Sequence, residues 1–250
     1  MRRLPLLLLP LLMCLPAKAQ QVSAPPDSSA FRASQLVAPS VLGGTGLALH
    51  FLAHNEIEVP VFSGMDGLLG SATPFVTGAG EVGRFLPSAM HLTLAFAGAD
   101  SRVPFTDRLI ESVIGHSLSI GLGYAAKLLL QVPRPDGSDS RSMPSGHTLL
   151  AFTGAELTRL DYGNLWGAGA YAVSTATAAS RLCAGRHWLG DLFTGAGLGI
   201  LCAHAGKWLL GPVKSALGIS GTPQSGVQVA LAPASDPMSG TPLARVAVVF

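Results

Sequence analysis

Charged side chains are scarce in this sequence. Asp, Glu, Lys and Arg together make up only 12% of the 250 residues, whereas soluble domains average about a quarter. The formal net charge is +2 and there is no run of basic residues, which argues against a nucleic-acid partner. Mean hydropathy is +0.44. The shortage of charge therefore indicates membrane helices or an unusually buried helical protein.

Cysteine is also rare. Of the three cysteines, Cys14 lies in an N-terminal leader, which leaves Cys183 and Cys202 for the rest of the chain. These two either form one disulfide or remain buried reduced thiols, and the sequence favours neither strongly. Both lie in apolar segments, where a small buried residue is the ordinary role of cysteine.

The leader, residues 1–19, has the pattern of a secretory signal. A basic start, Arg2-Arg3, precedes a leucine-rich run that ends in an A-x-A sequence at Ala19. This order is typical of a signal peptide, and cleavage is expected after Ala19. Residues 20–35 are polar and contain Pro and Ser, so they are interpreted as a linker.

Apolar runs separated by Pro, Gly and polar residues follow. The run at 36–53 is marginal as a membrane span, and we expect it to lie at the membrane interface. Residues 54–83 are broken by Pro and Gly, and they are expected to form a loop with one short helix near 65–72. Further helices are expected at 84–99, 108–131, 146–160, 164–182 and 188–210.

These runs predict an all-α fold, an antiparallel bundle of about five or six membrane-spanning helices. The bundle domain is expected to cover 36–211, with a motif core at 84–211. The tail, 212–250, contains two stretches rich in β-branched residues, 227–233 and 243–250. A β-hairpin is possible there, with disorder as the alternative.

Three widely separated cations, Lys127, Arg134 and Arg181, lie near the ends of these helices. If they converge, they need an anion between them. Guanidinium groups bind tetrahedral oxyanions bidentately and an ammonium adds a point charge. The turn at Ser145-Gly146 starts a helix, and its free N–H groups form a further anion site.

Two histidines and one carboxylate accompany the cations. Asp191 lies one helical turn after His187, so the two can share a helix face. A carboxylate bonded to one imidazole nitrogen leaves the other nitrogen as a nucleophile. His147, beside the anion site, could protonate a leaving alcohol. Together these residues predict metal-free phosphoryl transfer through a phosphohistidine.

The same residues resemble the three-part signature of the type 2 phosphatidic acid phosphatase (PAP2) superfamily. The signature reads K-x6-R-P, P-S-G-H and S-R-x5-H-x3-D, and this chain meets it at 127–135, 144–147 and 180–191. The resemblance covers about residues 84–211. It implies roles for the following residues: His187 as nucleophile, Asp191 as its orienting partner, His147 as general acid, and Lys127, Arg134, Ser145, Gly146 and Arg181 as phosphate binders.

The resemblance implies a phosphatase that uses no metal or other cofactor. The expected substrate is a lipid phosphomonoester or pyrophosphate, and the expected partner is the membrane. One alternative is a soluble periplasmic acid phosphatase of broad specificity. A second is a vanadate-dependent haloperoxidase, because vanadate occupies the same kind of phosphate site. A scaffold that only binds phospholipid is the weakest reading.

The expected location is a bacterial inner membrane with the site facing the periplasm. A cleaved signal puts the mature N-terminus outside, so an outward site requires 36–53 to lie at the interface and five spans to follow. Arg102, Arg108 and Arg159 then fall on cytoplasmic loops, as the positive-inside rule requires.

One further pair of residues could bind a metal. His50 and His54 are four residues apart and could share a helix face. No third ligand lies at motif spacing, and Glu56 is misplaced for an H-E-x-x-H motif. We therefore interpret the two histidines as structural.

Overall fold

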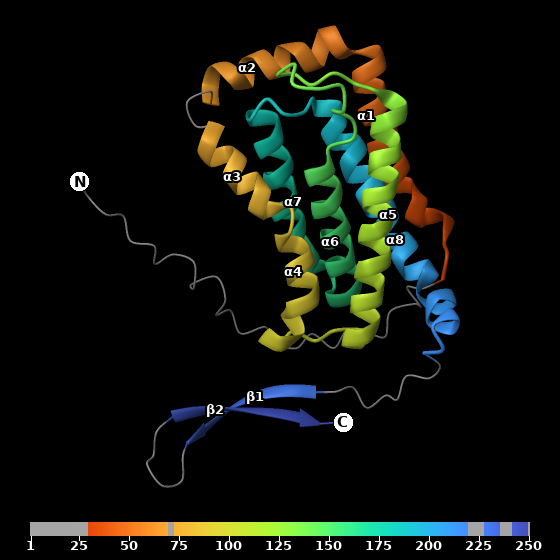
Figure 1. Cartoon of the computed structure of the whole chain (residues 1–250), viewed down its shortest axis with the longest axis vertical. Helices are drawn as coiled ribbons and strands as arrows, with labels where there is room; N and C mark the ends of the chain where they lie inside the picture. The colour runs from red at the N-terminus through yellow and green to blue at the C-terminus, as the bar shows by residue number, and fades with distance from the viewer. Residues whose placement is uncertain (1–29, 70–72, 220–227, 236–241, 250) are drawn as a thin grey trace, which may run out of the picture.

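The computed structural model describes residues 30–69, 73–219, 228–235 and 242–249 (Figure 1). Within these ranges the chain forms the expected helical bundle and one β-hairpin. The expected signal peptide and most of the expected linker lie outside the described residues. The helices of the bundle are α1 (Val37–Leu52), α2 (Val59–Leu69), α3 (Thr73–Gly83), α4 (Leu86–Thr93), α5 (Phe105–Leu130), α6 (Gly146–Tyr162), α7 (Asn164–Cys183) and α8 (Leu189–Ala216).

Short helical turns connect some of these helices. Two are 3-10 turns, η2 (Ala33–Leu36) before α1 and η5 (Leu94–Ala97) after α4. The third, η3 (His54–Glu58), is a π-helical turn between α1 and α2.

Helix α8 lies at the centre of the bundle and packs against α1, α5 and α6. Successive helices from α5 to α8 run in opposite directions (Figure 1). The α5–α6 loop and the α7–α8 loop therefore lie at the same end of the bundle, with α2 lying across it (Figure 1). We call this the site end, because all three motif segments, 127–135, 144–147 and 180–191, lie there.

Glycines let the helices approach backbone to backbone. Gly46 of α1 lies against Thr194 and the carbonyl of Gly190 in α8, where a β-carbon would clash. Gly199 of α8 lies equally close to the carbonyl of Leu149 in α6. Small residues at helix contacts are typical of packing within a membrane, so the glycine content serves the close approach to α8.

Helix α1 packs within the bundle domain that was expected to cover 36–211, and the expected interfacial position of 36–53 stays a prediction. Near its start, the Trp208 indole donates a 3.0 Å hydrogen bond to Gln35 Oε1. Near its end, Glu58 accepts the N–H of Gly190 at the start of α8. The helix therefore runs beside α8 and begins at the end of the bundle opposite the site end.

The region 54–83 is more helical than expected. Instead of a loop with one short helix, it contains η3, α2 and α3, although 70–72 lie outside the described residues. Pro60 and Pro74 are each the second residue of their helix. Proline fits the first turn, because its missing N–H has no partner within the helix there. The prolines therefore mark helix starts rather than breaks.

The last helix is longer than expected. Helix α8 continues through Pro212 to Ala216, whereas an end before Gly211 was expected. Proline removes only one backbone hydrogen bond, and helix continuation near the terminus tolerates that loss. The first residues of the expected tail thus belong to α8.

The tail contains the hairpin that the sequence allowed. Strands β1 (Gln228–Ser235) and β2 (Pro242–Val249) pair antiparallel, with Gln228 opposite Val249 and Ser235 opposite Pro242. The division into linker, bundle domain and tail remains a prediction.

Apolar side chains cover much of the outside of the bundle. On α5, Leu109, Val113, Ile120 and Leu129 are exposed. By length and composition, Ala33–Leu52 and Phe105–Leu130 could each cross a membrane. An exposed apolar surface of this extent favours a lipid environment, and the chain is membrane-associated.

Candidate functional site

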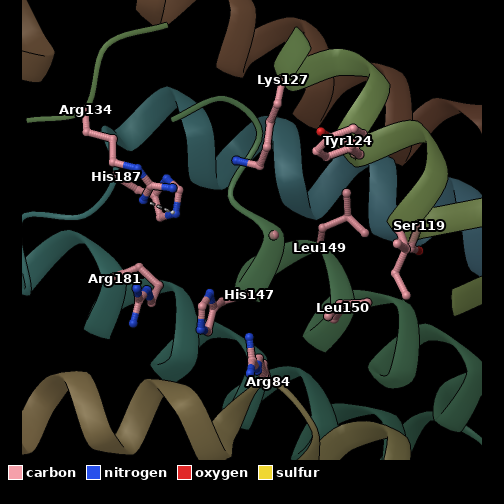
Figure 2. A pocket seen from close by; sticks show the side chains of 13 residues that line it. Arg84, Ser119, Tyr124, Lys127, Arg134, His147, Leu149, Leu150, Arg181 and His187 are labelled. Atoms are coloured by element: carbon pink, nitrogen blue, oxygen red, sulfur yellow. Dashed lines mark hydrogen bonds between the residues drawn. The ribbon is translucent and has the colours of Figure 1, made fainter. Parts of the chain in front are cut away.

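A cavity of about 340 Å³ lies at the site end. The helix ends that surround it come from α5, α6, α7 and α8, so residues far apart in sequence share one space. Figure 2 shows the charged side chains around it. Six of the expected site residues line the cavity: Lys127, Arg134, Gly146, His147, Arg181 and His187.

His187 is buried in the loop between α7 and α8. Its Nδ1 lies 3.3 Å from Asp191 Oδ2. Its Nε2 lies 3.5 Å from Nη1 of Arg134, and a guanidinium can only donate. Nε2 is therefore the acceptor, with its lone pair on the side of Arg134 and the cavity (Figure 2).

Burial lowers the pKa of His187 to about 4. The carboxylate of Asp191 opposes this effect, whereas the charges of Lys127 and Arg134 lower the pKa further. The imidazole is therefore neutral at neutral pH. A neutral ring with one nitrogen held by a carboxylate is the form that a histidine nucleophile requires.

Asp191 is the anchor of the site, in the first turn of α8. It is fully buried, and its Oδ2 accepts the backbone N–H of Trp188 at 2.8 Å. Its carbonyl accepts the N–H of Ser145 at 3.0 Å, which joins the start of α8 to the start of α6. Ser145 and Asp191 thus lie behind the cavity and fix its walls.

Ser142 is a site residue that sequence reasoning missed. Its hydroxyl donates to Asp191 Oδ2 and lies 3.3 Å from Nδ1 of His187. The resemblance assigned this position no role, and a lone serine in a polar loop carries no distinguishing signal. The structure makes it a second contact of the buried carboxylate.

The α5–α6 loop holds two of the cations in place. Lys127 Nζ donates to the carbonyls of Arg141, at 2.6 Å, and Ser142, at 3.1 Å. Arg134 donates from Nε to Asp139 at 2.8 Å and from Nη1 to the carbonyl of Arg186 at 3.0 Å. Lys127 is thus positioned by two backbone carbonyls, and Arg134 by one backbone carbonyl and the carboxylate of Asp139.

The start of α6 offers backbone donors. Ser145 is the N-cap residue, but its side chain makes no capping hydrogen bond; its hydroxyl instead accepts from Thr148 Oγ1 at 3.1 Å. The first N–H groups of a helix have no partner within it, and Gly146 lines the cavity. This helix start therefore has the free donors that an anion site requires, and anion binding there stays a prediction.

A second acidic residue, Glu81 of α3, was missed by the sequence analysis. Its Oε1 lies 2.8 Å from Nε2 of His147 and 3.4 Å from Nη1 of Arg181. Its Oε2 pairs with Arg84 at 3.2 Å, and Arg84 also lines the cavity. The region 54–83 was expected to be mostly loop, so neither residue could be placed. Their spacing of three residues on a helix was the available signal.

Four guanidinium or ammonium groups, two histidines and a buried carboxylate thus surround one cavity in an antiparallel helical bundle. This arrangement defines an oxyanion-binding site with its own candidate nucleophile and acid. The family model for the PAP2 superfamily matches residues 109–212, from α5 to α8. Over this region the chain matches the PAP2 superfamily, the family that the sequence resemblance predicted.

A curated relative agrees with this assignment. Lipid A 1-phosphatase from Porphyromonas gingivalis is 33% identical over 142 residues, which are 55% of this chain and 32% of the relative. This chain therefore spans about a third of the length of that relative.

One solved structure shares the fold. The transmembrane PAP2 type phosphatidylglycerolphosphate phosphatase from Bacillus subtilis superposes with a TM-score of 0.52 at 19% identity, covering 74% of this chain and 96% of that chain. The bundle therefore has the fold of a membrane PAP2 protein. LpxE from Aquifex aeolicus gives a TM-score of 0.46 at 23% identity, over 60% of this chain and 94% of that chain.

Proposed function

We propose that this protein is a phosphatase that hydrolyses a lipid phosphomonoester or pyrophosphate through a phosphohistidine. The observation that carries the proposal is the orientation of His187. Its Nδ1 faces Asp191, and its Nε2 accepts from Arg134 beside the cavity. The match to the PAP2 family model and the fold support the same proposal.

Phosphate binding comes first in the proposed mechanism. Lys127, Arg134 and Arg181 neutralise the charge of the phosphoryl oxygens, together with the free N–H groups that begin at Gly146. The N–H of Ser145 already donates to the carbonyl of Asp191. The developing charge on the equatorial oxygens is stabilised by donors that are already in place. Such preorganised electrostatics supplies most of the rate in phosphoryl transfer.

The first chemical step forms a bond from His187 Nε2 to phosphorus. The bond from phosphorus to the ester oxygen breaks, and its electron pair stays on that oxygen. His147 donates a proton to it, so the lipid leaves as an alcohol or, from a pyrophosphate, as a monophosphate. Burial lowers the pKa of His147 to about 4 in the free site, and the carboxylate of Glu81 and the negative charge of the bound phosphate favour the protonated ring that this step requires. Asp191 stabilises the positive charge that the attack creates on the ring of His187.

Water completes the cycle. His147, now neutral, accepts a proton from the attacking water, whose oxygen bonds to phosphorus while the nitrogen–phosphorus bond breaks. Inorganic phosphate leaves, and His187 returns to its neutral form. Every proton transfer is assigned to a residue of this chain.

A lipid substrate is favoured by the rest of the cavity. Ile120, Leu149 and Leu150 line it beside the cations, and Ile120 is also exposed on the apolar outside of α5. An acyl chain could therefore lie against apolar side chains while its phosphate lies among the cations. The named activities of the relatives are consistent with a lipid phosphate.

We further propose a bacterial inner-membrane location with the site end facing the periplasm. Since α1 begins at the opposite end, Ala33 then lies on the cytoplasmic side if α1 crosses the membrane. Cleavage after Ala19 occurs on the outer face, so it is compatible with an outward site only if α1 does not cross. N-terminal sequencing of the mature protein tests which of these applies.

The decisive experiment measures both phosphate release and the covalent intermediate. Purified wild type and His187→Ala are assayed on a panel of lipid phosphates and on p-nitrophenyl phosphate. Both proteins are also incubated with ³²P-labelled substrate and quenched during turnover. We expect preference for one lipid and an acid-labile label on wild type only. Undiminished turnover by His187→Ala would sink the mechanism. Equal turnover of small soluble esters would favour the acid phosphatase alternative.

A further inference from the structure

A compact cluster of His50, His54 and Glu58 lies behind the start of α8, separate from the residues that line the cavity. Nδ1 of His50 lies 2.9 Å from Glu58 Oε2, and Nδ1 of His54 lies 2.7 Å from the same oxygen. The sequence offered no third ligand for the two histidines. The π-helical turn η3 supplies one, because it brings Glu58 back against both rings.

The charge of Glu58 needs compensation. Its side chain is fully buried, and among the described residues its ion-pair partners are these two histidines alone. Its other oxygen accepts the N–H of Gly190. A buried carboxylate is expensive unless it is paired or coordinates a metal. Neither histidine is a permanent cation, so a bound metal ion would supply the positive charge that the cluster lacks.

We propose that His50, His54 and Glu58 bind a zinc ion. Two imidazole nitrogens and one carboxylate oxygen are a typical zinc ligand set, with a solvent molecule as the fourth ligand. Metal–ligand bonds of about 2.0–2.2 Å hold the ligand atoms of a tetrahedral site roughly 3.4 Å apart. The present separations of 2.9 and 2.7 Å therefore need an expansion of roughly 0.5–0.7 Å. The side chain of His54 is 31% exposed, which provides an entry path.

Zinc binding would release any proton shared in the cluster. Each histidine coordinates through Nδ1 as the neutral ring, with its proton on Nε2. The ion then supplies two positive charges to one buried carboxylate. This departs from the expectation that the chain holds no metal, but the proposed phosphoryl transfer still proceeds without one.

The ion would affect the site by fixing the position of the loop that carries His187. Glu58 holds Gly190, the residue before Asp191, and the ring of His54 packs on Trp188 with centroids 4.6 Å apart. Trp188 in turn follows His187 and donates from its indole to the carbonyl of Pro133 at 2.8 Å. Zinc would thus tie α1 and η3 to the loop that carries the nucleophile. Only this positional effect rests on the proposed function.

The test is metal content, measured on full-length protein purified without a histidine tag. Wild type, His50→Ala, His54→Ala and Glu58→Gln are loaded with Zn²⁺, desalted and analysed by inductively coupled plasma mass spectrometry. His116→Gln is the matched control, because His116 bonds to Ser88 and the Ser112 carbonyl instead. We expect one equivalent of zinc on wild type and control, and its loss from each cluster variant.

A second measurement avoids dependence on variants that fail to fold. X-ray absorption of zinc-loaded wild type should show nitrogen and oxygen ligands only, with multiple scattering from two imidazoles. No zinc on wild type, or full zinc on His50→Ala and Glu58→Gln, would overturn the site. Neither metal content nor X-ray absorption depends on phosphate release. Zinc binding without any phosphatase activity would therefore refute the proposed function but still support the zinc site.

Discussion

At the scale of single residues, the ionisation of His187 sets the acid limit of activity. Protonation removes the Nε2 lone pair, so kcat/KM should fall as the pH drops through about 4 rather than 6.5. Lys127 lowers this pKa, so Lys127→Met should move the acid limb to higher pH in addition to weakening phosphate binding. The measurement is a pH profile of kcat/KM. Arg186→Ala is the control, and an unmoved limb in Lys127→Met would contradict the electrostatic account.

The free energy of unfolding should also depend on the ionisation of His187. In the unfolded chain His187 binds its proton near the ordinary pKa of 6.5, and in the folded chain only near 4. The unfolded state therefore binds more protons between these values, and the free energy of unfolding falls as the pH drops from about 6.5 to about 4.

Glu81 is argued to position His147, and leaving-group dependence tests this. General acid catalysis matters most for a poor leaving group such as a lipid alcohol and least for p-nitrophenol. Glu81→Ala should reduce kcat on the lipid by roughly 10–100-fold and on p-nitrophenyl phosphate much less. Glu81→Gln retains an acceptor oxygen and should recover part of the loss. Equal losses on both substrates would assign Glu81 a merely structural role.

The residues of the motif could be placed from sequence because their chemistry is restrictive. Few other roles put fixed cations, histidines and a carboxylate at the ends of apolar helices. Glu58, Glu81 and Ser142 could not be placed, because each acts through a contact with a residue distant in sequence. Their partners are fixed by the packing of α1 and α3 rather than by local spacing.

At the scale of elements, the close contact of α1 with α8 depends on Gly46. Gly46→Leu places a side chain against the backbone of α8, and overpacking of this kind costs about 1–3 kcal/mol. Gly44→Leu is the matched control, because a β-carbon there meets no atom within 4 Å. Thermal unfolding in detergent should show a lower Tm for Gly46→Leu only. Similar Tm values for both variants would mean that α1 packs loosely.

The sequence predicted the order of the helices correctly, but the predicted effect of proline on the helix boundaries was wrong. Pro60 and Pro74 were expected to interrupt helical structure, although each occupies the first turn of a helix. The last helix was likewise expected to end before Pro212. A proline is compatible with a helix start or with its continuation, and only the surrounding packing decides which applies.

At the scale of the whole molecule, the orientation of the bundle is testable with single cysteines. Ser138 lies in the exposed loop at the site end, and Asp100 is exposed at the opposite end. Ser138→Cys and Asp100→Cys are made with Cys14, Cys183 and Cys202 replaced by Ala. An outward site predicts that an impermeant maleimide labels position 138 in intact spheroplasts, and position 100 only after lysis. The reverse pattern would place the site in the cytoplasm.

The far end of the bundle has a consequence for how the protein is made. Lys207 of α8 is buried and pairs with Glu111 of α5, at 2.8 Å, and with Asp161 at the end of α6. During synthesis α5 and α6 emerge first, and their carboxylates have no ammonium until α8 follows. Helix α8 therefore supplies Lys207, whose charge pairs with the carboxylates of α5 and α6. It also supplies Asp191, which completes the site. A ribosome that stops early would release a chain that is neither stably assembled nor active.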